Sequence, residues 1–179
     1  MTKMALDVTP HWFVAHTRYF RQEMKVGEWL SGHGFENFVP TVQTRITRRG
    51  QRGSRAGERP AVPNYVFVRV DKATACSFVS DYKLPMQYLT DCATHKMMVV
   101  PDKAMDDFRR VFDYSIEEGG LVDQPLELGE RVRVIEGPLK DVEGFVAELQ
   151  GRYYVVVDIL GMIWAKARIP RAWLMRIEK

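Results

Sequence analysis

The sequence has few of the residues on which most catalytic and metal sites depend. Its 179 residues include only two cysteines and four histidines. Cys76 and Cys92 stand among helix-like and strand-like residues, which suits reduced thiols packed as small apolar side chains. One cysteine pair cannot complete a zinc site, and no histidine has a carboxylate or cysteine at ligand spacing. We therefore expect no metal, no cofactor and no enzymatic activity.

Long apolar runs are absent as well. None approaches the ~20 residues that cross a bilayer, and residues 1–7 lack the apolar core of a secretory signal. A hydrophobic content of 46% with 27% charged residues is typical of a folded soluble protein. We expect a cytoplasmic monomer that contacts no membrane, with one ordinary domain or two small ones.

The net charge is only +3, but arginines gather in one segment, residues 45–59, which contains a single acid, Glu58. Glycines interrupt this segment and almost nothing apolar follows Ile46, so we expect a hairpin tip or loop outside any core. Because guanidinium groups form forked hydrogen bonds with phosphates, we favour nucleic-acid contact over the alternative of a loop that only aids solubility. The candidate residues are Arg45, Arg48, Arg49, Arg52 and Arg55.

The first two thirds of the chain mixes strands and helices. Residues 11–16 form an apolar strand, and Thr17 is placed to cap a helix over 18–31 that stops at Gly32. A helix that opens at Pro101-Asp102 has apolar residues at helical spacing. The other predicted elements are strands at 38–46, 64–70, 86–90 and 96–100 and a short helix at 74–80. This order predicts a small α/β or α+β sandwich, and for the whole chain we favour the α+β class.

The last third is predicted to be all strand. Residues 117–125 carry glycines, acids and a proline, which is typical of a linker, and the β-branched residues 152–159 should form a permanent strand. In segment 128–146, valines alternate with arginines, and Gly137 and Gly144 stand where a tight loop needs a positive φ or close backbone approach. This pattern resembles the KOW motif of small SH3-like β-barrels.

The motifs of a second resemblance follow one another from about Thr9 onward. They are His11-Trp12-Phe13-Val14, Arg18 and Glu23, Phe38-Val39-Pro40, Pro63-Asn64-Tyr65-Val66-Phe67-Val68, Val100-Pro101-Asp102 and the KOW segment. Their order and separations resemble the NusG family of transcription elongation factors. The arginine-rich hairpin and the ending Ile177-Glu178-Lys179 are most similar to specialised paralogues typified by RfaH and UpxY. General NusG proteins more often have glycine where Asn64 stands.

The resemblance implies an N-terminal NGN-type α/β sandwich over residues 9–116, with an antiparallel sheet and flanking helices, a linker at 117–125 and a KOW barrel over 126–179. It also implies an operon-specific elongation and antitermination factor that suppresses pausing or termination, for example on surface-polysaccharide genes. One alternative is a general NusG that also couples to Rho or the ribosome. Another is a ribosome- or RNA-binding KOW protein with an unrelated N-terminal domain.

In the family, an aromatic-rich depression docks on the clamp helices of RNA polymerase. The matching residues here are Trp12, His16, Pro63, Tyr65 and Phe67. Strand alternation places Tyr65 and Phe67 on one face, where a paired aromatic contact is available. A core position is the favoured alternative for Trp12, whereas the hydroxyl of Tyr65 favours the interface.

Three further contacts are implied. Cys76-Ser77 matches a segment that touches the other side of the polymerase cleft, with a core position for Cys76 as an equal alternative. Arg18, Arg21 and Lys25 match the helix surface near non-template or upstream DNA, although a solvated helix face has the same pattern. Ile159-Leu160-Gly161 matches an Ile-Phe-Gly tip that reaches a ribosomal protein or Rho. Leucine keeps the bulk without the ring, which favours the ribosomal protein over Rho.

Overall fold

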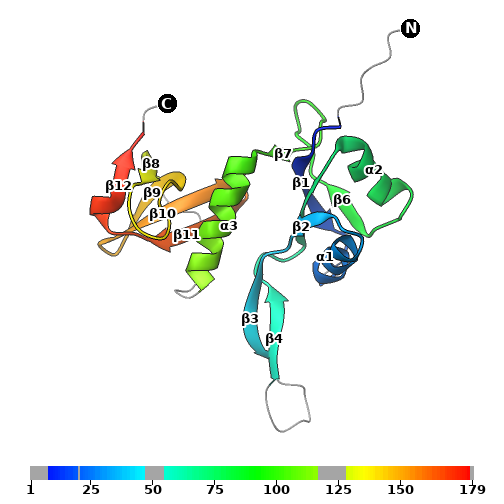
Figure 1. The fold of residues 1–179 in the computed structure, drawn as a ribbon, viewed down its shortest axis with the longest axis horizontal. Coiled ribbons are helices and arrows are strands. Elements are labelled where there is room, and N and C mark those ends of the chain that lie inside the picture. The colour runs from blue at the N-terminus through cyan, green and yellow to red at the C-terminus, as the bar shows by residue number, and fades with distance from the viewer. Residues whose placement is uncertain (1–7, 20, 47–54, 117–127, 178–179) are drawn as a thin grey trace. The chain divides into compact units, whose positions relative to one another are not determined.

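The computed structural model describes residues 8–19, 21–46, 55–116 and 128–177. Contacts divide the chain into two compact units, Met1–Val100 and Pro101–Lys179, and each is described by itself. Figure 1 labels the helices and strands of both units.

The first unit is built on an antiparallel sheet in the order β2-β5-β1-β6, with β7 also paired to β1. Its central strands, β1 (His11–Thr17) and β5 (Tyr65–Val70), pair from His11 opposite Val70 to His16 opposite Tyr65. The outer strands are short: β2 (Glu36–Phe38), β6 (Met86–Tyr88) and β7 (Val99–Val100). The predicted strands are therefore present, with 86–90 and 96–100 shortened and 38–46 divided in two.

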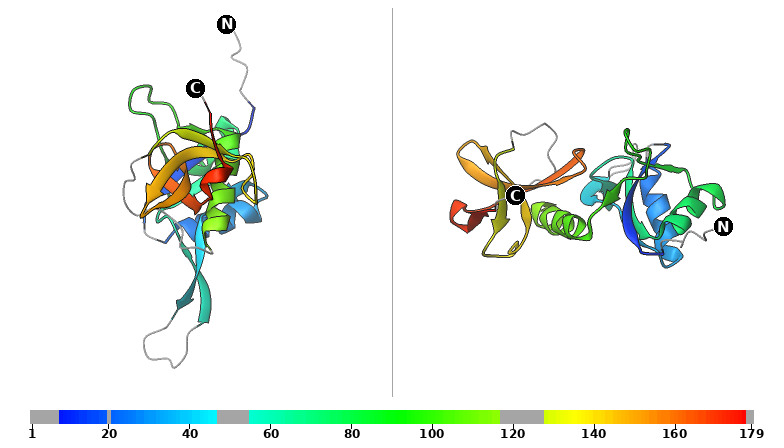
Figure 2. Two further views of the ribbon diagram at one scale, coloured as in Figure 1. Left: turned by 90° about the vertical axis from the view of Figure 1, so that its left-hand side faces the viewer. Right: turned by 90° about the horizontal axis from the view of Figure 1, so that it is seen from above.

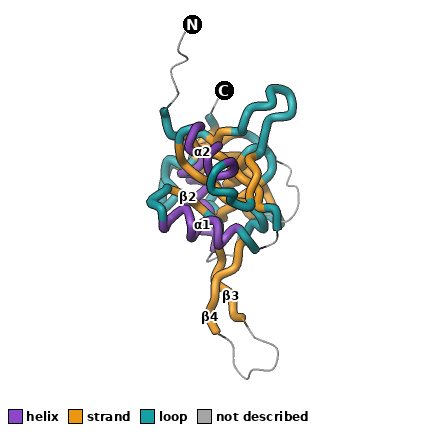
Figure 3. Tube along the Cα trace, turned by 90° about the vertical axis from the view of Figure 1, so that its right-hand side faces the viewer, coloured by secondary structure: helices purple, strands orange, loops and turns teal. Residues whose placement is uncertain are grey.

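Two helices, α1 (Glu23–Gly32) and α2 (Lys72–Ser80), cover one face of this sheet (Figures 1 and 3). The core between them contains alternate residues of β1 and β5 together with Val26 and Leu30 of α1 and Ala75 and Phe78 of α2. Asp71 caps α2, because its side chain accepts hydrogen bonds from the amides of Ala73 and Thr74.

The predicted start of the first helix is wrong. Thr17 is the last residue of β1, and α1 begins only at Glu23. The Thr17 side chain is buried and its hydroxyl lies 3.3 Å from the carbonyl oxygen of Tyr19, so it serves the turn rather than a helix end. Arg21 has a φ of 66°, which no helical residue adopts.

The hairpin of β3 (Thr41–Ile46) and β4 (Arg55–Pro60) projects from the first unit (Figures 1 and 2). Its two strands pair only with each other, from Thr41 opposite Pro60 to Ile46 opposite Arg55. Residues 45–59, which we expected to form a hairpin tip or loop, are thus strand at both ends of the segment. Residues 47–54 lie outside the described residues.

The second unit contains an antiparallel sheet in the order β11-β10-β9-β8-β12. Its strands are β8 (Arg131–Val134), β9 (Glu143–Leu149), β10 (Arg152–Ile159), β11 (Ile163–Arg168) and β12 (Leu174–Arg176), the last preceded by the short 3₁₀ helix η1 (Arg171–Trp173). The expectation that this region is strand, including residues 152–159, is confirmed. Closure of the sheet into a barrel stays a prediction.

Both glycines singled out in the sequence meet the expected constraint. Gly137 has a φ of +82°, and a Cβ there would lie 2.3 Å from the ring of Trp173. A Cβ on Gly144 would lie 2.4 Å from the carbonyl oxygen of Val156. The β8–β9 turn and the β9–β10 pairing therefore each require a residue without a side chain.

Helix α3 (Asp102–Ile116) packs against β10 and β11 and is grouped with the second unit. The predicted apolar positions Met105, Phe108, Val111 and Phe112 are all buried. We expected this helix in the first domain, which we placed at residues 9–116, and the expected linker at 117–125 lies outside the described residues. In the part of the chain that the structure describes, no helix is long and apolar enough to cross a membrane.

Candidate functional site

Four of the five residues matched to a polymerase contact lie on one face of the first sheet, and the fifth, Pro63, lies in the turn before β5. Because paired residues of antiparallel strands point to the same face, the pairs Trp12–Arg69, Val14–Phe67 and His16–Tyr65 share a face, and the core face holds Phe13, Ala15, Val66 and Val68. The candidate face is therefore the one opposite the face that α1 and α2 cover.

Exposure divides this face into two parts. Trp12 and Phe67 are 2% and 0% exposed, so both are buried side chains, and Val14 between them is also buried. His16 is exposed and Tyr65 is half-buried. The structure fits the alternative that we favoured for Trp12, a core position. Phe67 is buried in the same way.

The open part of the face is a small aromatic patch, which we call the His16–Tyr65 patch. The two rings meet edge to face, with centroids 5.4 Å apart and planes at 84°. Gln87 pairs with His16 on β6 and is exposed on the same side. The sequence did not predict that Gln87 belongs to this patch, because only the pairing of β6 with β1 places Gln87 beside His16.

The turn before Tyr65 fixes the edge of this patch. Pro63 is exposed, and Asn64 has a φ of 68°, in the left-handed region that glycine and asparagine tolerate best. The carbonyl oxygen of Asn64 accepts a hydrogen bond of 2.8 Å from the amide of Thr17, which joins the turn to the end of β1. Pro63, His16 and Tyr65 are thus held at one end of the sheet.

We expected Arg18, Arg21 and Lys25 on one face of a helix, but the three residues do not lie on a common helix face. Arg18 and Arg21 precede α1, and only Lys25 lies in the helix. All three side chains are exposed. The spacing of three and four residues therefore has no helical meaning here, and the match of Arg18 and Arg21 to a helix surface is wrong.

The arginine hairpin is described only in part. Arg45 and Arg55 lie on β3 and β4, where they pair with Ala56 and Ile46 through the backbone. Arg48, Arg49 and Arg52 lie outside the described residues. Arg59 is exposed on β4. A hydrogen bond of 2.8 Å from the Gln43 side chain to the Glu58 carboxylate joins β3 to β4.

The segment Cys76-Ser77 lies on α2, on the opposite side of the sheet from the His16–Tyr65 patch. Cys76 is exposed, and the Ser77 hydroxyl donates to the Thr74 carbonyl at 2.8 Å. Both cysteines are free thiols, as expected, but Cys76 and Cys92 are exposed rather than packed as apolar side chains. Cys76 follows the buried Ala75 by one residue, about 100° around the helix, which turns it away from the core.

The predicted tip of the second unit is the turn between β10 and β11. Ile159 is 1% exposed and belongs to the core, whereas Leu160 and Gly161 have positive φ angles of 56° and 72°. Asp158 accepts a hydrogen bond of 2.9 Å from the Gly161 amide, and burial raises the pKa of its carboxyl. Met162 is 45% exposed, so Leu160 and Met162 form the apolar tip. The motif match missed Met162.

Metal ligands do not gather at any of these surfaces. Over residues 8–19, 21–46, 55–116 and 128–177, no group of three or more His, Cys, Asp or Glu side chains could hold a metal ion.

Sequence comparisons with known proteins agree on one family. The family described as "Transcription termination factor nusG" matches residues 10–109. The "Transcription termination/antitermination protein NusG" of Pseudomonas aeruginosa is 32% identical over 133 residues, which is 70% of this chain and 71% of that protein. A solved structure described as "Domain interaction in Thermotoga maritima NusG" aligns with 95% of this chain and 98% of its own, at 21% identity and a TM-score of 0.45.

The extent of the family match decides between the alternatives that the sequence left open. Because the family match begins at residue 10, it covers most of the first unit, which is therefore related to NusG. The alternative of a KOW protein with an unrelated N-terminal domain is wrong. The family match over residues 10–109 and the 32% identity to the Pseudomonas protein show that this chain belongs to the NusG family of transcription termination and antitermination factors.

Proposed function

We propose that the chain is an operon-specific transcription elongation and antitermination factor that binds the clamp helices of RNA polymerase and suppresses pausing or termination. The observation that carries this proposal is the His16–Tyr65 patch, an aromatic pair left open at the end of an otherwise buried sheet face. Large flat side chains at such positions are the usual anchors of protein interfaces.

The patch has the rigidity that an anchor needs. Tyr65 lies on the central strand β5, is paired through the backbone with His16 on β1, and follows a turn that Thr17 and Asn64 hold closed. A side chain fixed in this way loses little conformational entropy when a partner covers it. Trp12 and Phe67, on the same face, support the patch from within the fold and do not need to touch the polymerase.

Nucleic acid is the second partner in this proposal. The β3–β4 hairpin extends away from the sheet, and it carries Arg45, Arg55 and Arg59 on its two strands (Figure 1). Backbone pairing stiffens the hairpin, so guanidinium groups on it can reach phosphates of non-template or upstream DNA without ordering a free loop. Arg18, Arg21 and Lys25, all exposed at the end of β1 and on α1, are further candidates.

The second sheet supplies a separate docking point. Leu160 and Met162 present apolar surface at the β10–β11 turn, where Asp158 fixes the loop. We assign this tip to a ribosomal protein rather than to Rho. Cys76 and Ser77 on α2 would make the second polymerase contact, with the exposed Cys76 as the reachable group.

Genome-wide chromatin immunoprecipitation of the tagged chain tests the operon-specific part of this proposal. We expect the factor to follow RNA polymerase through one or a few operons and to be missing from most transcribed genes. Occupancy of nearly every transcribed gene would instead identify a general NusG that couples to Rho or the ribosome. Failure to follow polymerase anywhere would contradict the polymerase contact itself.

A further inference from the structure

A groove lies between helix α1, strand β2 and the start of the β3–β4 hairpin, and we call it the α1–β2 groove (Figure 3). Its volume is about 490 Å³, within the range of about 300–1,000 Å³ that ligand pockets occupy. The whole groove belongs to the first unit, and it shares no residue with the His16–Tyr65 patch. The residues that define it here are Met24, Glu28, Asn37, Phe38, Val39 and Glu58.

The floor of the groove is preformed. Gly27 is buried in α1, and a Cβ there would lie 2.8 Å from Cγ2 of Val39, so the helix and the chain after β2 approach too closely for a side chain. The Asn37 side-chain amide donates to the Ser31 hydroxyl at 2.8 Å and to the Phe35 carbonyl oxygen at 3.0 Å. These contacts join β2 to the C-terminal end of α1, so little order has to be created when a partner binds.

The charged residues that line the groove, Glu28 and Glu58, are both acidic and exposed. Within the part of the chain that the structure describes, no ion pair neutralises either carboxylate. The Gln43 side chain donates to Oε1 of Glu58 at 2.8 Å, which orients this carboxylate and leaves Oε2 available. Because Glu58 is the single acid of the arginine-rich segment 45–59, the groove is a negative site next to a positive hairpin.

Apolar surface accompanies the two carboxylates. Met24, Phe38 and Val39 line the groove and are half-buried. Carboxylates beside apolar groups suit a long basic side chain, whose methylene stem packs on the apolar surface while its charged head hydrogen-bonds to the acids. Arginine fits such a site better than lysine, because its planar fork offers several donors in fixed directions and is more weakly hydrated.

We propose that the α1–β2 groove is a docking site for an arginine-bearing segment of a partner protein. The arginine stem packs against Met24, Phe38 and Val39, and the guanidinium group hydrogen-bonds to the carboxylates of Glu28 and Glu58. Charge complementarity selects this occupant, since the same carboxylates repel the phosphates of a nucleic acid. The inference does not depend on the proposed polymerase contact.

Titration of the intact ¹⁵N-labelled chain with the synthetic peptide acetyl-Gly-Arg-Leu-Arg-Gly-amide gives the first test. We expect saturable shifts confined to amides around the groove, with a Kd that rises as salt is added. The control peptide carries citrulline, which has nearly the same shape without the charge, in place of both arginines, and it should not bind. Equal binding of the two peptides, or shifts spread evenly over acidic residues of the whole surface, would overturn the proposal.

The variant Glu28→Gln/Glu58→Gln gives the second test, because it removes both charges and keeps the size of both side chains. We expect the Kd for the arginine peptide to rise about three- to tenfold, as two partly exposed ion pairs predict, with an unchanged melting temperature. The matched control, Asp106→Asn/Asp113→Asn, removes two exposed acids outside the groove and should bind like the wild type. Wild-type affinity in the folded groove variant would overturn the proposal. Shifts of the groove amides on dilution of the chain alone would identify a second copy as the occupant and would contradict the assignment to another protein.

Discussion

Removal of the Tyr65 ring should separate binding from stability. In Tyr65→Ala the fold loses an edge-to-face contact with His16, whose centroid lies 5.4 Å away, and such pairs contribute about 0.5–1.5 kcal/mol. Tyr65 is half-buried, so its truncation should cost less stability than truncation of a fully buried aromatic residue. As an interface anchor, however, the same ring would contribute about 2 kcal/mol to polymerase binding, which corresponds to about 30-fold in Kd.

Phe67→Ala is the matched opposite. Its side chain is 0% exposed, and truncation of a buried phenylalanine costs about 3–5 kcal/mol, a large share of the stability of a small protein. The loss of binding should then follow the loss of folded protein. Tyr82→Ala is the surface control, since Tyr82 is 55% exposed and contacts Trp29 and Phe78 on the α1 and α2 side.

Two measurements on the same samples decide the matter: urea denaturation for the free energy of unfolding, and titration of labelled protein with RNA polymerase for Kd. We expect Tyr65→Ala to weaken binding far more than it reduces stability, and Tyr82→Ala to bind like the wild type. Equal binding by Tyr65→Ala and the wild type would refute the assignment of the His16–Tyr65 patch. A parallel loss of stability and binding would place Tyr65 in the core.

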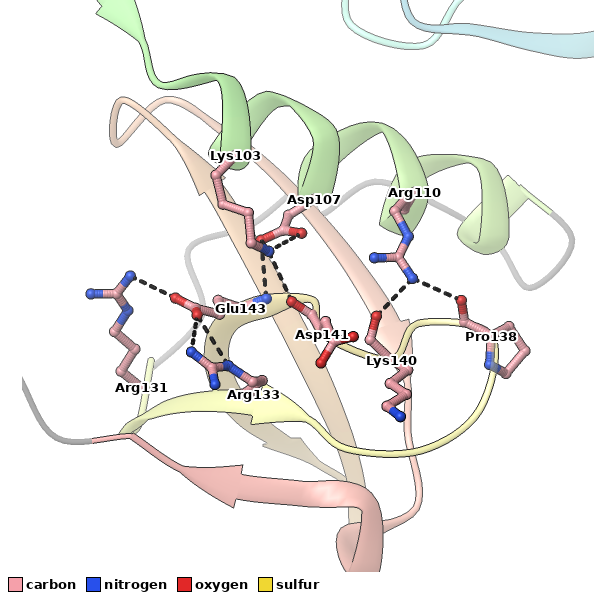
Figure 4. A network of polar contacts seen from close by, with 9 residues as sticks. All are labelled: Lys103, Asp107, Arg110, Arg131, Arg133, Pro138, Lys140, Asp141 and Glu143. Carbon is pink, nitrogen blue, oxygen red and sulfur yellow. Dashed lines mark hydrogen bonds and ion pairs between the residues drawn. The ribbon is translucent and has the colours of Figure 1, made fainter.

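Three further predictions concern charge, packing and pH. Serine at four hairpin arginines should leave the melting temperature unchanged but flatten the salt dependence of binding to elongation complexes, by about one unit of slope per lost phosphate contact; the positions are Arg48, Arg49, Arg52 and Arg55. Gly144→Ala should destabilise by about 1–3 kcal/mol in thermal unfolding, because its Cβ would meet a backbone oxygen at 2.4 Å, whereas Gly32→Ala, with open space around it, should not. A hydrogen bond from Arg133 (Figure 4) holds the pKa of Glu143 below its ordinary value, so the stability that it adds is present at neutral pH and is lost as the pH falls through the lowered pKa. The gap in melting temperature between Glu143→Gln and the wild type should therefore shrink as the pH falls below the ordinary glutamate pKa of about 4.3, and a constant gap would contradict this.

The sequence predicted strands and buried residues well where side-chain periodicity carries the information. The alternation along β1 and β5 placed Tyr65 and Phe67 on one face, and helical spacing predicted the buried side of α3. Periodicity does not report which neighbour a face packs against. The grouping of α3 with β10 and β11 depends on contacts between distant segments, so it could not be derived from spacing alone.

Other misses have local causes. The start of α1 was misplaced because Thr17 suits an N-cap by residue type, yet its hydroxyl serves a turn and Arg21 adopts a left-handed conformation. Asn64 seemed to distinguish this chain from general NusG proteins. With a φ of 68° it meets the same backbone demand as a glycine, so the difference has a conformational explanation. Met162 became visible only when the β10–β11 turn showed which side chains reach solvent.

The central claim, that this member of the NusG family keeps RNA polymerase transcribing, is tested most directly by single-round transcription with purified polymerase on a template that carries a pause site and a terminator. We predict shorter pauses and more read-through with the wild-type chain, and neither effect with Tyr65→Ala. No change in pausing or read-through, or more termination when Rho is present, would contradict the account.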